Sequence, residues 1–281
     1  MPKNTNFSSA SGPLSVGNVV SAGLRIYRDR FKLYYGLAFT AYVWLLIPIY
    51  GWAKFSAISG LISRLAYYEV SETPETVSEA RSYVNSRMWT FFWAGLLVTL
   101  IILGVTIGGG CVFGVVAVGI AAIVGQQPSG AGLLIAFLLG GLAFIALIFG
   151  YIRVFSHVSL VEMPIAIEDN ITASSAISRS WELTQGFIGY LQLIFFVALL
   201  ISFPITIFIN IIGIVLQAIL PLAFPKDSPM FDLVFLILNL GITFASSALL
   251  LPFWQTIKAV IYYDLRSRKE GLGLRLRDSG Y

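Results

Sequence analysis

Five long apolar blocks alternate with short polar segments along the chain. They cover residues 33–68, 89–125, 131–152, 187–224 and 231–257. The apolar runs are unbroken and lack the two-residue alternation of an outer-membrane barrel, so the pattern predicts α-helices. A helix crosses a bilayer with about 20 apolar residues, and several of the blocks exceed that length. The sequence therefore predicts an all-α fold, a polytopic bundle of transmembrane helices.

Lys and Arg favour the cytoplasmic side of a membrane, so their positions predict the topology. Five lie before residue 33 and six after residue 257, which predicts cytoplasmic N- and C-termini and an even number of crossings. About six crossings result if the first block is a hairpin that turns near Lys54 and each other block crosses once. Only Lys54 and Lys226 then lie outside. A rival arrangement splits the second block and moves Arg64, Arg81 and Arg87 outside, so we favour the first.

Composition excludes a water-soluble globule. Hydrophobic residues make up 57% of the 281 residues and charged residues 11%, whereas ordinary soluble domains have about 25% charged residues. The mean hydropathy of +0.84 implies that most apolar side chains face lipid. No polar stretch is long enough to form a separate soluble domain. We predict a disordered polar N-terminus over residues 1–13, one integral membrane domain over 14–270 and a tail over 271–281.

A short signature of Ser, then Arg, then an aromatic residue precedes three of the apolar blocks. Its basic and aromatic members are Arg25 and Tyr27, Arg81 and Tyr83, and Arg179 and Trp181. The three copies suggest internal repeats over residues 14–68, 73–152 and 170–262. In the first copy, apolar and polar residues occupy opposite helical faces, which is typical of a helix lying in the membrane interface. We therefore expect three interfacial helices that contact lipid headgroups or a partner protein.

Two aromatic residues and a basic cluster follow the last apolar block. They are Tyr262, Tyr263, Arg266, Arg268 and Lys269. Interfacial aromatics anchor a helix, and basic side chains at the membrane surface attract anionic headgroups by on the order of 1 kcal/mol each. The basic residues lie close to the bilayer and are too few to form a groove for nucleic acid. We expect membrane lipids as partners here, and no nucleic acid.

Glycines and a proline divide the two longest uncharged blocks and predict helix breaks. These residues are Gly108, Gly109, Gly110 and Pro204. Broken helices at mid-membrane depth are typical of transporters, and Thr206 and Asn210 follow the second break. The absence of charge disfavours ion-coupled transport but allows a lipid or a small neutral substrate. Kinking and close helix packing are the simpler explanation.

Residues suited to catalysis are few. His157 is the one histidine and has no second ligand at metal-binding spacing. Glu162, Glu168 and Asp169 lie in a polar segment, where loop solubility and helix capping explain carboxylates without chemistry. We therefore expect no catalytic residue, no cofactor and no metal, and a protein that is not an enzyme.

Several segments resemble bacterial proteins that carry the membrane domain of glycerophosphoryl diester phosphodiesterase. They are PLSVG at 13–17, RIYR at 25–28, SRSWELTQG at 178–186 and YYDLRSRKEG at 262–271. The stretch YVWLLIPIYGWAK at 42–54 looks most like the stand-alone cyanobacterial members. In bifunctional relatives the enzyme is a separate soluble barrel, for which this chain has neither the length nor the histidines. The resemblance implies a multi-helix membrane module without phosphodiesterase activity, in a bacterial inner (plasma) membrane or a thylakoid membrane.

Three hypotheses for the function stay open at this point. The leading one is a non-enzymatic membrane protein whose cytoplasmic interfacial helices engage anionic lipid headgroups or a partner protein, including a second copy of the chain. The second is a transporter or flippase for a lipid or small amphiphile, on account of the expected helix breaks. The third is an accessory subunit or assembly factor of a larger, photosynthetic membrane complex, on account of the cyanobacterial resemblance.

Overall fold

The computed structural model describes residues 14–125, 130–225 and 228–271. Within these ranges the chain forms ten helices and no strand, which confirms the all-α prediction. The helices are α1 Val16–Asp29, α2 Phe31–Trp44, α3 Tyr50–Val70, α4 Val77–Ser86, α5 Met88–Val124, α6 Gly130–Val158, α7 Glu162–Ile167, α8 Ala173–Thr184, α9 Ile188–Ala223 and α10 Pro229–Glu270. The predicted disordered N-terminus, and the predicted tail beyond residue 271, lie outside the described residues.

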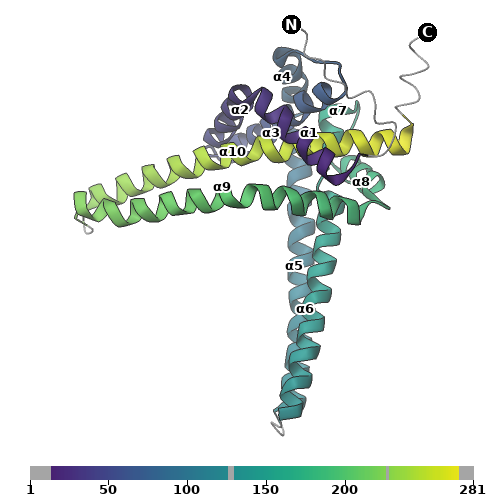
Figure 1. The fold of residues 1–281 in the computed structure, drawn as a ribbon, viewed down its shortest axis with the longest axis vertical. Coiled ribbons are helices and arrows are strands. Elements are labelled where there is room, and N and C mark those ends of the chain that lie inside the picture. The colour runs from purple at the N-terminus through teal and green to yellow at the C-terminus, as the bar shows by residue number, and fades with distance from the viewer. Residues whose placement is uncertain (1–13, 126–129, 226–227, 272–281) are drawn as a thin grey trace.

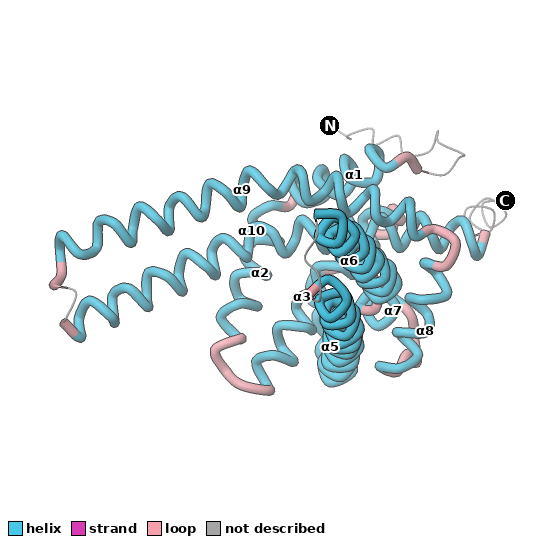
Figure 2. Tube along the Cα trace, turned by 90° about the horizontal axis from the view of Figure 1, so that it is seen from below, coloured by secondary structure: helices cyan, strands magenta, loops and turns pink. Residues whose placement is uncertain are grey.

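The molecule consists of a compact head and two long helical arms. Figure 1 shows the α5–α6 arm and the α9–α10 arm leaving the head in different directions. The head contains α1–α4, α7, α8 and the adjoining ends of the four arm helices, as the tube in Figure 2 shows from below. Each arm is a pair of antiparallel helices that reverses at a short connection.

Four helices are long and apolar enough to cross a membrane. They cover Met88–Ala122, Gly132–Ile167, Ile188–Leu222 and Pro229–Glu270, and no more than 6% of the most apolar window of each is buried inside the protein. Exposed apolar helices of this length require lipid around them, so the chain is a multi-pass membrane protein. The first apolar block, which forms α2 and α3, is not among these four helices.

The arms have the length that a bilayer requires. Apart from Leu220 near its tip, the described residues of the α9–α10 arm are not buried beyond Ser202 on α9 and beyond Ala248 on the returning helix. The stretch of each helix beyond these residues is about 20 residues, or ~30 Å, which equals the thickness of the hydrocarbon core. The α5–α6 arm beyond Ala94 and Ser156 is longer, at about 40 Å, and matches the core plus part of the headgroup region.

The last third of α10 is the centre of the head. Ile257, Ile261, Tyr262 and Leu265 have no exposed surface, and α10 packs against α1, α2 and α3. The approach of α1 is so close that a Cβ atom built on Gly23 would lie 2.8 Å from Cγ1 of Ile257 and 3.0 Å from its Cα. Glycine at this position therefore allows the two helices to pack.

The three amphipathic helices are present, but their apolar faces are not in lipid. Val20 and Tyr27 on α1, Val84 on α4 and Leu183 on α8 are all buried in the head. The interpretation of these segments as helices lying in the membrane interface is wrong in this respect. An amphipathic pattern shows that one face is covered, but it is the same whether lipid or protein covers it.

The order of the helices has a threefold form. A short helix precedes a helical pair in α1 with α2–α3, in α4 with α5–α6, and in α8 with α9–α10. The predicted repeats over 14–68, 73–152 and 170–262 follow the same divisions, and their common origin stays a prediction.

The expected helix breaks do not interrupt the helices. Helix α5 is continuous through Gly108, Gly109 and Gly110, and α9 is continuous through Pro204. In lipid an interrupted helix leaves backbone groups without hydrogen-bond partners, so a continuous helix is favoured even across these residues. The first hairpin also differs from the prediction, since it turns at residues 45–49 and Lys54 lies within α3.

Candidate functional site

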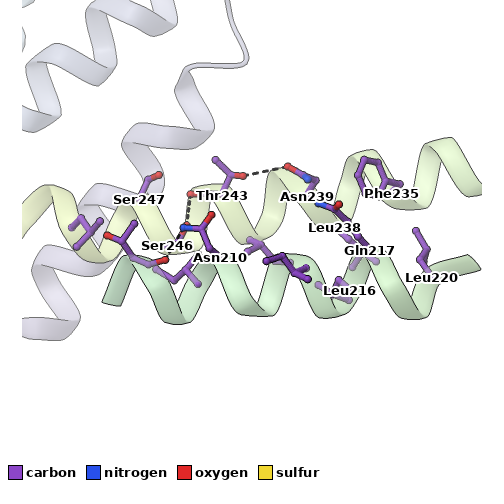
Figure 3. A pocket seen from close by; sticks show the side chains of 16 residues that line it. Asn210, Leu216, Gln217, Leu220, Phe235, Leu238, Asn239, Thr243, Ser246 and Ser247 are labelled. Carbon is purple, nitrogen blue, oxygen red and sulfur yellow. Dashed lines mark hydrogen bonds between the residues drawn. The ribbon is translucent and has the colours of Figure 1, made fainter. Parts of the chain in front are cut away.

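A polar groove runs between α9 and α10 within their arm. Its volume is about 380 Å³, which is within the range of small-molecule sites. The polar residues that line it are Thr206, Asn210, Gln217, Asn239, Thr243, Ser246 and Ser247 (Figure 3). Their spacing of three or four residues puts them on one face of each helix. Two helices that otherwise face lipid thus present their amide and hydroxyl side chains to the same groove.

Hydroxyl groups in the groove bind their own helix. Thr206 Oγ1 donates to the carbonyl of Ser202 at 3.1 Å, and Ser246 Oγ donates to the carbonyl of Thr243 at 3.0 Å. Such local bonds satisfy a hydroxyl at membrane depth without a second molecule. These local bonds account for the hydrogen bonding of the two hydroxyl groups, but they do not account for the carboxamide side chains in the groove.

The carboxamides of the groove have spare hydrogen-bonding capacity. Asn210 donates its Nδ2 to the carbonyl of Thr206 at 2.7 Å, and Asn239 Oδ1 accepts from Thr243 at 3.4 Å. Gln217 is exposed and makes no side-chain hydrogen bond to any residue that the structure describes. An amide that faces hydrocarbon without a partner costs several kcal/mol, so the groove suits an occupant that can hydrogen-bond.

The groove does not lie between the two predicted breaks. Gly108, Gly109 and Gly110 belong to the α5–α6 arm and Pro204 to the α9–α10 arm, and these arms diverge (Figure 1). A Cβ atom on Gly109 would lie 3.3 Å from Leu147 of α6, so this glycine allows α5 and α6 to pack closely. Of the breaks, only Pro204 lies beside the groove, two residues before Thr206.

A second polar centre, in the head, surrounds Glu168 in the loop after α7. Its Oε1 accepts a hydrogen bond from Tyr262 at 2.5 Å and from Arg179 Nε at 3.1 Å. Its backbone carbonyl accepts from the Tyr83 hydroxyl at 2.9 Å and from Arg87 Nη1 at 2.5 Å. Burial raises the pKa of Tyr83, so its hydroxyl stays protonated and donates. Glu168 thus joins the α7–α8 loop to α4, α8 and α10.

Arg179 is paired within the protein. Besides Glu168, it contacts Glu182 at 3.3 Å and Glu270, which also accepts from Arg266 Nε at 2.8 Å. Its side chain is 22% exposed. The predicted contact of Arg179 with lipid or a partner is thus replaced by three carboxylates of its own chain, whose negative charges satisfy the guanidinium in a partly buried place.

The remaining members of the C-terminal basic cluster also bind their own chain. Arg268 is 2.7 Å from Asp264 and lies over the Tyr190 ring at 4.7 Å. Lys269 donates to the carbonyl of Glu182, and Tyr263 packs against another tyrosine ring of the head at 6.0 Å. The C-terminal end of α10 is therefore held by the head, with Tyr262 fully buried.

The other members of the repeated signature have different environments. Arg25 and Arg81 are exposed on α1 and α4, whereas Tyr27 is buried. Trp181 is exposed and stacks on His157 with ring centroids 3.9 Å apart. Helix α4, which carries Arg81, is at the end of the molecule opposite the tip of the α5–α6 arm (Figure 1).

Sequence reasoning missed the role of Arg64. It assigned Arg64 to a membrane span, but the side chain is 7% exposed in the head, bonded to Glu75 at 2.6 Å and to the carbonyl of Ala166 at 2.6 Å. Its guanidinium lies over the Tyr83 ring at 3.7 Å. The signal was an arginine within an apolar helix. A guanidinium has a high free energy in lipid, and it is more stable in a protein core that supplies hydrogen-bond partners.

The three carboxylates of the polar segment after α6 form separate ion pairs. Glu162 binds Lys258 at 2.8 Å, and Asp169 binds Arg87 at 2.9 Å, while Glu168 has the partners described above. No group of three or more His, Cys, Asp or Glu residues that could hold a metal occurs in the part of the chain that the structure describes.

A shallow apolar pocket lies at the base of the α5–α6 arm. It has a volume of about 400 Å³ and is lined by Trp89, Trp93, Leu97 and residues 171–174. Trp89 and Trp93 are 47% and 54% exposed. Arg153 is exposed on the neighbouring helix α6. Exposed tryptophans and a cation at the end of a membrane helix are typical of the headgroup region.

Comparison with known proteins gives one match. The family model described as "Domain of unknown function (DUF7847)" matches residues 32–265. No curated protein and no solved structure matches the chain. The resemblance to the phosphodiesterase membrane domain is not part of this match and stays a prediction.

Proposed function

Because the chain belongs to the family of the domain of unknown function DUF7847, whose description gives no activity, we propose a function from the α9–α10 groove. We propose a non-enzymatic membrane protein that binds an amphiphilic lipid and lets its polar headgroup pass along the groove between the two leaflets. The observation that carries the proposal is an amide- and hydroxyl-lined groove in an arm that is otherwise apolar.

The length of the groove supports passage rather than a single binding point. It extends from Thr206 to Leu220 on α9 and from Phe235 to Leu250 on α10. About 15 residues of helix correspond to ~22 Å, most of the ~30 Å hydrocarbon core. A headgroup in the groove can exchange hydrogen bonds with successive side chains while its acyl chains stay in lipid.

The chemistry of the groove favours a neutral or zwitterionic headgroup and passive movement. None of the 16 residues that line it is ionisable. The outer face of the same arm is apolar, with Phe208 64% and Ile211 51% exposed. Without a charged group in the path, no proton or ion is coupled to the movement, and the lipid follows its own gradient.

A vesicle assay tests this function. We expect the purified protein, in vesicles with a fluorescently tagged phospholipid, to expose inner-leaflet lipid to an impermeant reductant without added nucleotide. The double variant Asn210→Leu/Asn239→Leu should lose most of this activity, because leucines remove the hydrogen-bonding groups. Thr106→Leu, a polar-to-apolar change on the exposed side of α5, is the matched control and should behave as wild type. A wild-type rate equal to that of empty vesicles would overturn the proposal.

Binding of anionic headgroups at the cytoplasmic surface is the second candidate function. It is favoured by Arg153, which is exposed on α6, and by the exposed Trp89 and Trp93, which line the apolar pocket at the base of the same arm. We expect Arg153→Glu to weaken anionic lipid retention in mixed nanodiscs at least about fivefold, since one basic residue contributes ~1 kcal/mol near the surface. Lys226→Glu, the same charge change between α9 and α10, is the control. Equal retention by both variants would exclude Arg153 as the contact.

The distribution of basic residues supports cytoplasmic termini. If the four apolar helices are the crossings, 17 of the 18 Lys and Arg residues fall on the head side and Lys226 alone falls outside. The six-crossing arrangement also left Lys54 outside. The head is then cytoplasmic, and the protein is placed in a bacterial inner membrane or a thylakoid membrane as the resemblance suggests.

A further inference from the structure

The turn between α2 and α3 presents apolar side chains to its surroundings. Those exposed between residues 39 and 52 are Phe39 39%, Val43 45%, Leu46 60%, Ile47 47%, Ile49 57%, Tyr50 44% and Trp52 48%. We name this segment the α2–α3 tip. No charged residue occurs between Lys32 and Lys54. A continuous apolar surface of this kind on one element marks a site for lipid or for a partner.

The α2–α3 tip does not cross the membrane. Lys54, near the start of α3, donates its Nζ to Asn85 Oδ1 at 3.2 Å. Asn85 lies in α4, which directly precedes the crossing helix α5. At the other end of α3, Arg64 binds the carbonyl of Ala166 in the head. Both ends of α3 are thus on the head side, whereas a transmembrane hairpin would separate Lys54 and Asn85 by the ~30 Å of the bilayer core.

The α2–α3 tip is continuous with the lipid-facing surface of α10. Tyr42 packs against Phe55 of α3 at 5.2 Å and against Phe244 of α10 at 6.0 Å. Phe244 is on the arm side of Ala248, the residue where burial of α10 in the head begins. Four residues correspond to ~6 Å along the helix, so the tip reaches the outermost part of the hydrocarbon that surrounds the arm.

We propose that the α2–α3 tip is a re-entrant element that inserts into the cytoplasmic leaflet and returns to the same side, with acyl chains as its partner. The chain then crosses the membrane four times. Lipid is the occupant because the tip is uncharged and its aromatic packing joins it to a helix that is itself surrounded by lipid. Lys54 marks the level of the headgroups, and Tyr50, the first residue of α3, lies about one helical turn beyond it, next to the turn at residues 45–49.

Cysteine labelling tests the sidedness. In a Cys111→Ser background, single cysteines at Ile49, Ser82 and Ser228 are treated with an impermeant maleimide in right-side-out and inside-out vesicles. We expect Ser228→Cys, in the connection of the α9–α10 arm, to react from outside and Ser82→Cys, on α4, to react from inside. Ile49→Cys should react from neither side. Reaction of Ile49→Cys from outside would restore the six-crossing arrangement and overturn the proposal.

A depth measurement separates lipid from a protein cover. Ile49→Cys carrying a small fluorophore, attached in detergent, is reconstituted with lipids brominated near the headgroup end or near the end of the acyl chain. We expect strong quenching by the shallow bromine and at least a twofold weaker effect of the deep one. A fluorophore quenched by neither lipid but shielded from water would show a protein partner instead. Neither readout depends on lipid passage through the α9–α10 groove.

Discussion

At the scale of single residues, the head depends on a few buried charges with several partners each. Glu168 receives hydrogen bonds from Arg179 and Tyr262 through its side chain and from Tyr83 through its carbonyl. The sequence indicated that Glu168 is in a polar segment. It could not show which basic side chains from other helices would pair with this carboxylate. Arg179 was predicted as a contact for lipid or a partner protein because it belongs to the repeated signature, and its pairing with Glu270, 91 residues away, is formed only by the tertiary fold.

Removal of the Glu168 carboxylate should destabilise the head. In Glu168→Ala, the partly buried Arg179 and the fully buried Tyr262 lose an acceptor, and we expect a loss of about 2–4 kcal/mol in the free energy of unfolding. Asp169→Ala is the control, because Asp169 is 78% exposed and its pair with Arg87 should contribute about 1 kcal/mol or less. Thermal unfolding in nanodiscs measures both, and equal stability of the two variants would contradict the central role of Glu168.

At the scale of elements, apolar length predicted the four arm helices, while amphipathicity predicted α1, α4 and α8 but not their surroundings. An apolar helix of 35 residues with almost no burial in the protein can be covered only by lipid. The prediction from the sequence pattern therefore agrees with the structure for these helices. For α1 the same apolar stripe fits lipid or protein, and only its contact with α10 decides. The groove was signalled in part by Thr206 and Asn210, but its second wall, Asn239 to Ser247, became adjacent only through the hairpin.

The packing of α1 on α10 gives a test at this scale. We expect Gly23→Ala to cost about 1–3 kcal/mol, because the added methyl group would lie 2.8–3.0 Å from Ile257 and force the helices apart. Gly17→Ala in the same helix has no atom within 4 Å and should be neutral or stabilising by up to about 1 kcal/mol through helix propensity. Chemical denaturation of each variant compares them, and a neutral Gly23→Ala would show that α1 shifts freely on α10.

At the scale of the whole molecule, the divergence of the two arms conflicts with a flat membrane. Helices in bilayers tilt on average by about 20°, and both arms have to cross the same layer. Pro252 lies within α10 where it enters the head, and Gly186, with φ of +89°, lies two residues before Ile188, the first residue of α9. A proline removes one helical hydrogen bond and permits a bend, so these positions are suited to a swing of the α9–α10 arm.

A distance measurement tests this swing. Spin labels at Val118 and Leu222, which are 70% and 86% exposed near the ends of the two arms, should be closer together in nanodiscs than in the structure. We expect a single shorter distance, because both ends must reach the far leaflet of one bilayer. A distance unchanged from that of the divergent arms would mean that the arms are rigid and that only one of them crosses a flat bilayer.

The central place of the last third of α10 has a consequence for biosynthesis. A ribosome releases residues 251–270 after the membrane-crossing parts of all four long helices have been made, yet α1, α2 and α3 pack around this segment. The N-terminal helices therefore wait, without their buried partner, while about 180 residues beyond α3 are translated and inserted. Completion of the head thus depends on the last helix, so a product truncated before residue 251 leaves Tyr67, which packs against Tyr262 and Tyr263, without these partners and more open to proteolysis.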